Sequence, residues 1–188
     1  MNMSESVEYK KRDHILGGKV GEDTIHSLVE KIIEINRFDE RQLEKDKNYV
    51  AKPINIYINS IGGSMYDANF LIGVIQTSKT PVHTYAGGKI MSAGLYIFVA
   101  GHKRFTYELS TFMYHDGTVG LHNTIEGLKS DYEHQVNVRD RYDDYIARRT
   151  QLPKTVMDEM KKYHKDFYLN AEQAVEYGVA HEILKELA

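Results

Sequence analysis

The chain has 188 residues and a net charge of −3, and with 41% hydrophobic and 27% charged residues it can bury the core of a globular domain. It has no basic excess to favour nucleic acid or a membrane surface, and its lack of cysteine excludes disulfides, thiolate metal ligands and a cysteine nucleophile. The length predicts a single domain, residues 1–188. No segment has the pattern of a membrane span or a signal peptide, so we expect the protein in the cytoplasm.

The N-terminal quarter predicts an arm, a strand and a helix. Met1–Lys11 is polar and is expected to be a flexible arm, and His14–Val20 is expected to be a short strand. A helix follows the turn at Gly21, with a buried face of apolar residues at helical spacing: Ile25, Leu28, Val29, Ile32 and Ile33. Asn36–Lys52 is dense in charge and lacks periodicity, so we expect a solvated loop.

Two further strands and a helix are predicted in the middle of the chain. Ile54–Asn59 is the clearest strand, and the glycine-bearing segment Asn59–Ser64 is expected to form a turn. Ser64 and Asp67 match a capping box at the start of the next helix. The strand Val82–Ala86 follows and leads towards Ser92.

The segment Gly87–Gly101 predicts a loop that feeds a short buried helix, with Ser92 as its N-cap. Small residues follow Ser92, and the positive end of the helix dipole lies there. Such a hydroxyl suits a nucleophile whose product anion is held by backbone N–H groups. The alternative interpretation is an ordinary cap on a core helix.

The C-terminal half predicts more strands and helices in alternation. Short strands are expected at Lys103–Tyr107 and Thr111–His115, and a long helix with few apolar positions at Thr124–Arg149. The remaining predicted elements are a helix with Pro153 in its first turn, a helix from Asn170 to Tyr177, and a strand at Val179–Leu184. This repeated order favours a parallel α/β sheet with right-handed crossovers.

Three polar residues form a possible catalytic set. Ser92 is the candidate nucleophile, His115 at a predicted strand end is the candidate base, and Asp166 is the candidate carboxylate that orients the histidine. Spacing alone does not select these residues, because a lone histidine or acid is usually a satisfied surface or core group. The G-x-S-x-G elbow is absent and the residue order differs from that of the α/β-hydrolases, which disfavours that family.

Other chemistries find little support in the sequence. The pair Gly62-Gly63 lacks the G-x-G-x-x-G pattern and the Walker lysine, so nucleotide binding is disfavoured. It fits better a close approach of a peptide or an oxyanion to the backbone. The histidines show no ligand spacing, so we expect neither a metal nor another cofactor.

Several motifs together resemble the Clp protease proteolytic subunit family (ClpP). INSIGGSM at Ile58–Met65 is similar to the family's INSPGG signature, and Ala86–Gly101 aligns without a gap with the segment around its nucleophilic serine, which falls on Ser92. MYHDG at Met113–Gly117 resembles M-x-H-x-P, so the base falls on His115. The segment Lys165–Leu184 resembles the one that opens with the family's triad aspartate, and Asp166 takes that place.

The resemblance implies an α/β fold of the crotonase-like, ClpP-type βα superhelical class, with a protruding handle at about Asp116–Arg149. It implies a serine endopeptidase that degrades unfolded polypeptides inside a ring-shaped chamber, with catalytic residues Ser92, His115 and Asp166. The backbone N–H groups of Gly63 and Ala93 are the implied oxyanion donors. The implied partners are further copies of the chain, in heptameric rings stacked in pairs, and a hexameric AAA+ ATPase unfoldase.

The chain also departs from the family pattern and is therefore identified as a divergent member. The segment before the first strand is shorter than usual, and Asn55 replaces a tyrosine of the ATPase-docking pocket. Gly117 replaces the proline after the base, and residues 118–124 replace a glycine-rich strand that clamps substrate. The charged pair that links the rings falls on His164 and Lys165.

Two alternative functions follow from these departures and from the fold. One is a catalytically weak or regulatory ring subunit that modulates an active paralogue. The other is a crotonase acting on an acyl-CoA, which uses the oxyanion donors without a serine nucleophile. Replacing Ser92 by alanine would be harmless in that second case.

Overall fold

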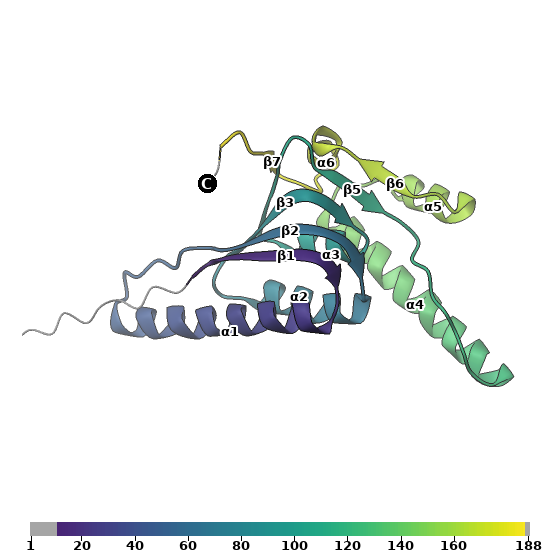
Figure 1. Ribbon diagram of the computed structural model, residues 1–188, viewed down its shortest axis with the longest axis horizontal. Coiled ribbons are helices and arrows are strands. Elements are labelled where there is room, and N and C mark those ends of the chain that lie inside the picture. The colour runs from purple at the N-terminus through teal and green to yellow at the C-terminus, as the bar shows by residue number, and fades with distance from the viewer. Residues whose placement is uncertain (1–10, 187–188) are drawn as a thin grey trace, which may run out of the picture.

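A seven-stranded sheet forms the centre of the computed structural model, which describes residues 11–186 (Figure 1). The predicted arm lies outside the described residues except for Lys11. The strands are β1 (Asp13–Val20), β2 (Ile54–Gly63), β3 (Val82–Met91), β4 (Lys103–Thr106), β5 (Thr111–Tyr114), β6 (Phe167–Leu169) and β7 (Glu182–Ile183). Their order is β1-β2-β3-β4-β7 with parallel neighbours, as the alternation of elements predicts.

Strand β3 has two partners along one edge and links the body of the sheet to a short extension. Its first half pairs with β4, and its second half, Lys89–Met91, pairs in parallel with β5 at Thr111–Met113. Strand β6 was not predicted; it adds to β5 in the antiparallel direction, so the sheet is mixed rather than purely parallel. The three candidate catalytic residues lie at the ends of the strands that form this extension: Ser92 follows β3, His115 follows β5, and Asp166 precedes β6.

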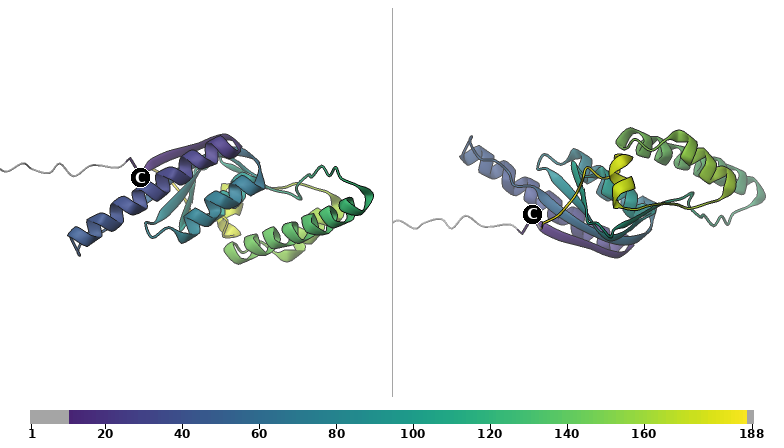
Figure 2. Two further views of the ribbon diagram at one scale, coloured as in Figure 1. Left: turned by 90° about the horizontal axis from the view of Figure 1, so that it is seen from below. Right: turned by 90° about the horizontal axis from the view of Figure 1, so that it is seen from above.

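Six helices are present among the described residues: α1 (Glu22–Lys45), α2 (Met65–Thr77), α3 (Ala93–Ala100), α4 (Ile125–Arg149), α5 (Lys154–Tyr163) and α6 (Ala171–Glu176). Figure 1 shows α1 and α2 along one face of the sheet, whereas α4 projects away from it as the predicted handle. Figure 2 shows the segment before α4 running outward beside that helix, which then returns towards the sheet. Within residues 11–186, no helix combines the length and apolar character that a bilayer crossing requires.

The core lies between the sheet and the helices because alternate residues of the strands are apolar. Ile54, Ile56 and Ile58 of β2 are fully buried, and they belong to one hydrophobic cluster with the inner faces of α1 and α2. Every residue of α3 is buried, as its unbroken apolar sequence predicts. This enclosed helix fixes the position of the serine that precedes it.

The predicted loop Asn36–Lys52 is wrong, because α1 continues to Lys45. Phe38 and Asp39 lie on the buried face of this extension, and Asp39 is satisfied by Arg12 and by a hydrogen bond of 2.6 Å from the Thr80 hydroxyl. Ile33, placed in the buried face by its spacing, is 36% exposed instead. Apolar periodicity does not predict this part of the helix, because one of its buried residues is a carboxylate with polar partners.

The predicted turn at Asn59–Ser64 and the predicted loop Gly87–Met91 are also corrected, because β2 and β3 extend through them. Backbone pairing with β1 and β5 holds both glycine-rich segments in the ladder. The helix after Ser64 is confirmed, and the Ser64 hydroxyl accepts the predicted bond from Asp67 N at 3.3 Å.

Candidate active site

Parallel pairing between β3 and β5 brings Ser92 and His115 together, since each follows the C-terminal end of one of these strands. The backbone N–H of Ser92 donates to the Met113 carbonyl at 3.0 Å and continues the ladder by one residue. His115 Nε2 lies 2.8 Å from Ser92 Oγ, which is hydrogen-bonding distance. A nucleophile and a base are therefore in direct contact.

The capping role predicted for the Ser92 side chain is wrong. Ser92 stands at the N-cap position of α3, but its φ of 52° and ψ of −127° are not those of an ordinary cap, and its hydroxyl makes no capping hydrogen bond. The Ser92 carbonyl instead accepts from Leu95 N at 2.9 Å. This backbone turns the hydroxyl away from the helix and towards the histidine.

Antiparallel pairing between β5 and β6 places Asp166 beside His115. Tyr114 is paired with Phe167, so His115 and Asp166 follow as the next opposed positions. Asp166 Oδ1 lies 3.8 Å from His115 Nδ1, within ion-pair range but longer than a hydrogen bond. The Tyr168 hydroxyl donates to Asp166 Oδ2 at 3.3 Å, a contact that the sequence pattern does not indicate.

The two predicted oxyanion donors lie on backbone segments that approach each other closely. At Gly62, which has a φ of +93°, an added Cβ would lie 2.6 Å from Ser92 Cβ and 3.0 Å from Ala93 N. At Gly63, with a φ of +151°, it would lie 2.2 Å from the Val20 carbonyl oxygen. Only glycine allows this approach, which places the end of β2 against the N-terminus of α3.

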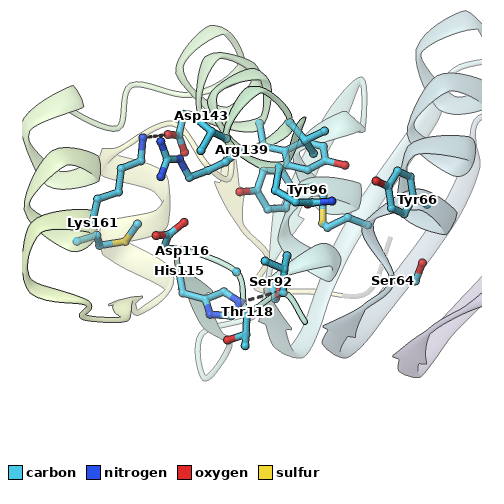
Figure 3. A pocket seen from close by; sticks show the side chains of 18 of the residues that line it. Ser64, Tyr66, Ser92, Tyr96, His115, Asp116, Thr118, Arg139, Asp143 and Lys161 are labelled. Atoms are coloured by element: carbon cyan, nitrogen blue, oxygen red, sulfur yellow. Dashed lines mark hydrogen bonds and ion pairs between the residues drawn. The ribbon is translucent and has the colours of Figure 1, made fainter. Parts of the chain in front are cut away.

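A cavity of about 610 Å³ adjoins the serine and the histidine (Figure 3). It lies between this corner of the sheet and helices α4 and α5. Its wall includes four tyrosines and four charged residues: Tyr66, Tyr96, Tyr132, Tyr142, Asp116, Arg139, Asp143 and Lys161. The cavity is large enough for one or two amino-acid side chains.

Comparison with known proteins identifies the family. Residues 6–187 match the family model described as Clp protease, so the chain belongs to the Clp protease family. It is 27% identical over 192 residues to the ATP-dependent Clp protease proteolytic subunit 2 of Treponema pallidum, covering 98% of this chain and 89% of the relative. It is 28% identical over 172 residues to subunit 1 of Prochlorococcus marinus, covering 90% and 82%.

The fold is also that of a solved family member. A mutant of ClpP1 from Listeria monocytogenes superposes with a TM-score of 0.76 at 21% sequence identity, covering 93% of this chain and 92% of that one. The predicted family and the predicted ClpP-type α/β fold are therefore confirmed, and the modest identities agree with a divergent member.

Proposed function

We propose that this chain is a serine endopeptidase of the Clp type that cleaves unfolded polypeptides. The observation that carries the proposal is the contact of 2.8 Å between Ser92 Oγ and His115 Nε2, at the edge of a cavity. A serine hydroxyl becomes a competent nucleophile when a neighbouring base accepts its proton. Membership of a family whose relatives are named protease subunits supports the same reaction.

In the proposed reaction, His115 Nε2 takes the Ser92 proton while Oγ attacks the peptide carbonyl. The negative charge that forms on the carbonyl oxygen is stabilised by the backbone N–H groups of Gly63 and Ala93. The bond to the amine then breaks, and His115 returns the proton to the leaving nitrogen. Water attacks the acyl-enzyme by the same route and regenerates Ser92.

Asp166 has a positioning role in this scheme. With His115 protonated on Nδ1, that N–H faces the Asp166 carboxylate, which stabilises the imidazolium when it forms. The separation of 3.8 Å requires a small movement, which is common in active sites without substrate. We propose that ring assembly or substrate binding shortens it.

The assembly proposed here is a chamber of heptameric rings stacked in pairs, fed by a hexameric AAA+ ATPase. The relatives are named ATP-dependent proteolytic subunits, which supports an ATPase partner. A second candidate function, a weakly active subunit that modulates an active paralogue, is favoured by the long contact between His115 and Asp166 and by the half-exposed Asp166 side chain.

A fluorophosphonate probe and fluorescent casein test the proposal. Wild-type protein should be labelled once per chain and should cleave casein, whereas Ser92→Ala should lose labelling and about 10⁴-fold or more in kcat. Ser130→Ala, an exposed position on α4, is the matched serine control and should retain both. Labelling that persists in Ser92→Ala would overturn the assignment of the nucleophile, and labelling without cleavage of short, internally quenched peptides, which need no ATPase to enter a chamber, would favour the weakly active subunit.

A further inference from the structure

The charged groups around the cavity do not balance. Arg139 and Lys161 supply two positive charges, and three carboxylates lie among or beside them: Asp116, Asp140 and Asp143. The residues that line the cavity balance, with two positive charges against Asp116 and Asp143, and the adjacent Asp140 gives the group one excess negative charge when His115 is neutral, as a general base must be. Figure 3 shows Asp116 next to His115, with Arg139, Asp143 and Lys161 beyond it.

Two of the carboxylates are already paired. Arg139 donates to Asp140 Oδ1 from Nε at 3.2 Å and from Nη2 at 3.0 Å. Asp143 forms an ion pair with Lys161 and accepts a hydrogen bond from the Tyr114 hydroxyl. These contacts neutralise both cations within the wall itself.

Asp116 is the carboxylate left over. Among the residues that the structure describes, none gives it a hydrogen bond or an ion pair, although it lines the cavity one residue after His115. Its charge nevertheless acts across the cavity: the pKa of Arg139 is raised first by the hydrogen bond to Asp140 and further by the negative charges of Asp140, Asp116 and Asp143.

The rest of the lining suits a long side chain with a cationic end. Apolar and aromatic residues, among them Tyr96, Tyr142 and Val136, can cover the methylene groups of lysine or arginine. Tyrosine ring faces also attract cations. An acidic side chain would add a fourth carboxylate to this wall, and a small apolar one would leave Asp116 without a partner.

We propose that the cavity selects lysine or arginine next to the bond that is cleaved, and that Asp116 is the residue that determines this preference. The inference rests on the proposed peptidase function, because it takes Ser92 as the point of cleavage. Asp116 acts by binding substrate and takes no part in proton transfer.

Cleavage of matched peptides tests the proposal. Wild-type protein should show a higher kcat/KM for internally quenched peptides that carry lysine at the cleavage point than for the same peptides with leucine or glutamate. Asp116→Asn should lower the lysine-to-leucine ratio of kcat/KM about twofold to fivefold, as expected for loss of an ion pair at a partly exposed carboxylate. The ratio cancels any effect of Asp116 on the neighbouring histidine, because both substrates use the same base.

Two other variants sharpen the result. Arg139→Gln removes the cation that pairs with Asp140 and should raise the lysine-to-leucine ratio, because the wall then carries one more net negative charge. Asp158→Asn makes the same change of net charge at an exposed position of α5 outside the cavity and should leave the ratio unaltered. Mass spectrometry of fragments from casein shows which residues flank the cleaved bonds. A ratio that is insensitive to Asp116, or that changes equally in Asp158→Asn, would overturn the proposal.

Failure of this inference is distinct from failure of the proposed function. Probe labelling and cleavage of leucine peptides with no effect of Asp116→Asn would reject the inference alone. If no peptide is cleaved, fluorescence anisotropy with Ser92→Ala still measures the preference: peptides ending in lysine should bind several times more tightly than those ending in leucine, and addition of Asp116→Asn should abolish the difference. Equal binding of the two peptides would contradict the inference whatever the activity.

Discussion

At the scale of single residues, the backbone of Ser92 is the feature on which the site depends. Its φ of 52° and ψ of −127° lie where residues with a side chain are rarely found, a strain of about 1–3 kcal/mol. The hydrogen bond from Ser92 N to Met113 and the complete burial of α3 hold the strained conformation in place. In this conformation the hydroxyl makes no capping hydrogen bond and points towards His115 instead.

Gly63→Ala should disable the site while leaving the catalytic side chains in the sequence. Its Cβ would lie 2.2 Å from the Val20 carbonyl oxygen, at a φ of +151° that disfavours alanine, so the end of β2 must move. We expect a loss of about 2 kcal/mol or more in unfolding free energy, measured with urea, and at least a hundredfold loss of kcat.

Gly73→Ala is the matched control for this substitution. Gly73 lies within α2 and an added Cβ meets nothing within 4 Å, so alanine should be neutral or stabilising there. A Gly63→Ala protein with wild-type kcat would contradict the assignment of an oxyanion donor at this position.

Local sequence pattern indicated Ser92, His115 and Asp166 only as a possible catalytic set, and the resemblance to a family assigned their roles. Spacing did not select His115 or Asp166 from the other histidines and acids, because antiparallel pairing of β5 with the unpredicted strand β6 is what opposes them. The contact of Tyr168 with Asp166 and the unbalanced charge of Asp116 depend on side-chain positions across several elements. No local pattern encodes such relations.

At the scale of elements, the strongly periodic segments were predictable and the polar helix extension was not. The first half of β2, α2 and α4 follow from alternation, capping and helical spacing. The second half of α1 follows instead from one buried ion pair, in which Arg12 Nη1 donates to Asp39 Oδ2 at 2.9 Å, and from the hydroxyls of Thr80 and Tyr49. These partners are 10 to 41 residues from Asp39 in the chain, beyond any local window.

Asp39→Asn should destabilise the protein in a manner that depends on pH. Burial raises the pKa of Asp39, but hydrogen bonds from Arg12, Thr80 and Tyr49 outweigh it, so the pKa lies below its usual value. A carboxyl with a depressed folded-state pKa stabilises the fold above its unfolded pKa of about 3.8, and that stability is lost as the pH falls through the folded value. We therefore expect a deficit of about 3 kcal/mol at pH 7 that narrows below about pH 4.

Urea unfolding from pH 7 to pH 3 measures this dependence. Glu40→Gln provides the control, because the adjacent Glu40 pairs with Lys79 at an exposed position and its loss should change stability little. A deficit for Asp39→Asn that stays constant over the whole range would show that the charge of Asp39 does not stabilise α1.

At the scale of the whole molecule, the handle leaves apolar surface uncovered. Only Ile146 of the 25 residues of α4 is buried. The helix and the segment before it expose Val119, Ile125 and Tyr132, of which Ile125 is 84% exposed. Val119 and Tyr132 also line the cavity, whereas Ile125 does not, and an exposed apolar side chain on a projecting element is typical of a surface that another chain covers.

We expect this surface to join chains in the proposed double ring, so that wild-type protein elutes as a particle of fourteen chains by size-exclusion chromatography with light scattering. Ile125→Glu places a charge in the contact and should shift the particle to seven chains or fewer. Val50→Glu makes the same kind of change at a residue that is 83% exposed in the loop after α1, and should leave the mass unaltered. A fourteen-chain particle in Ile125→Glu would show that Ile125 of the handle is not needed for ring stacking. A monomeric wild-type protein would contradict the proposed ring-shaped chamber.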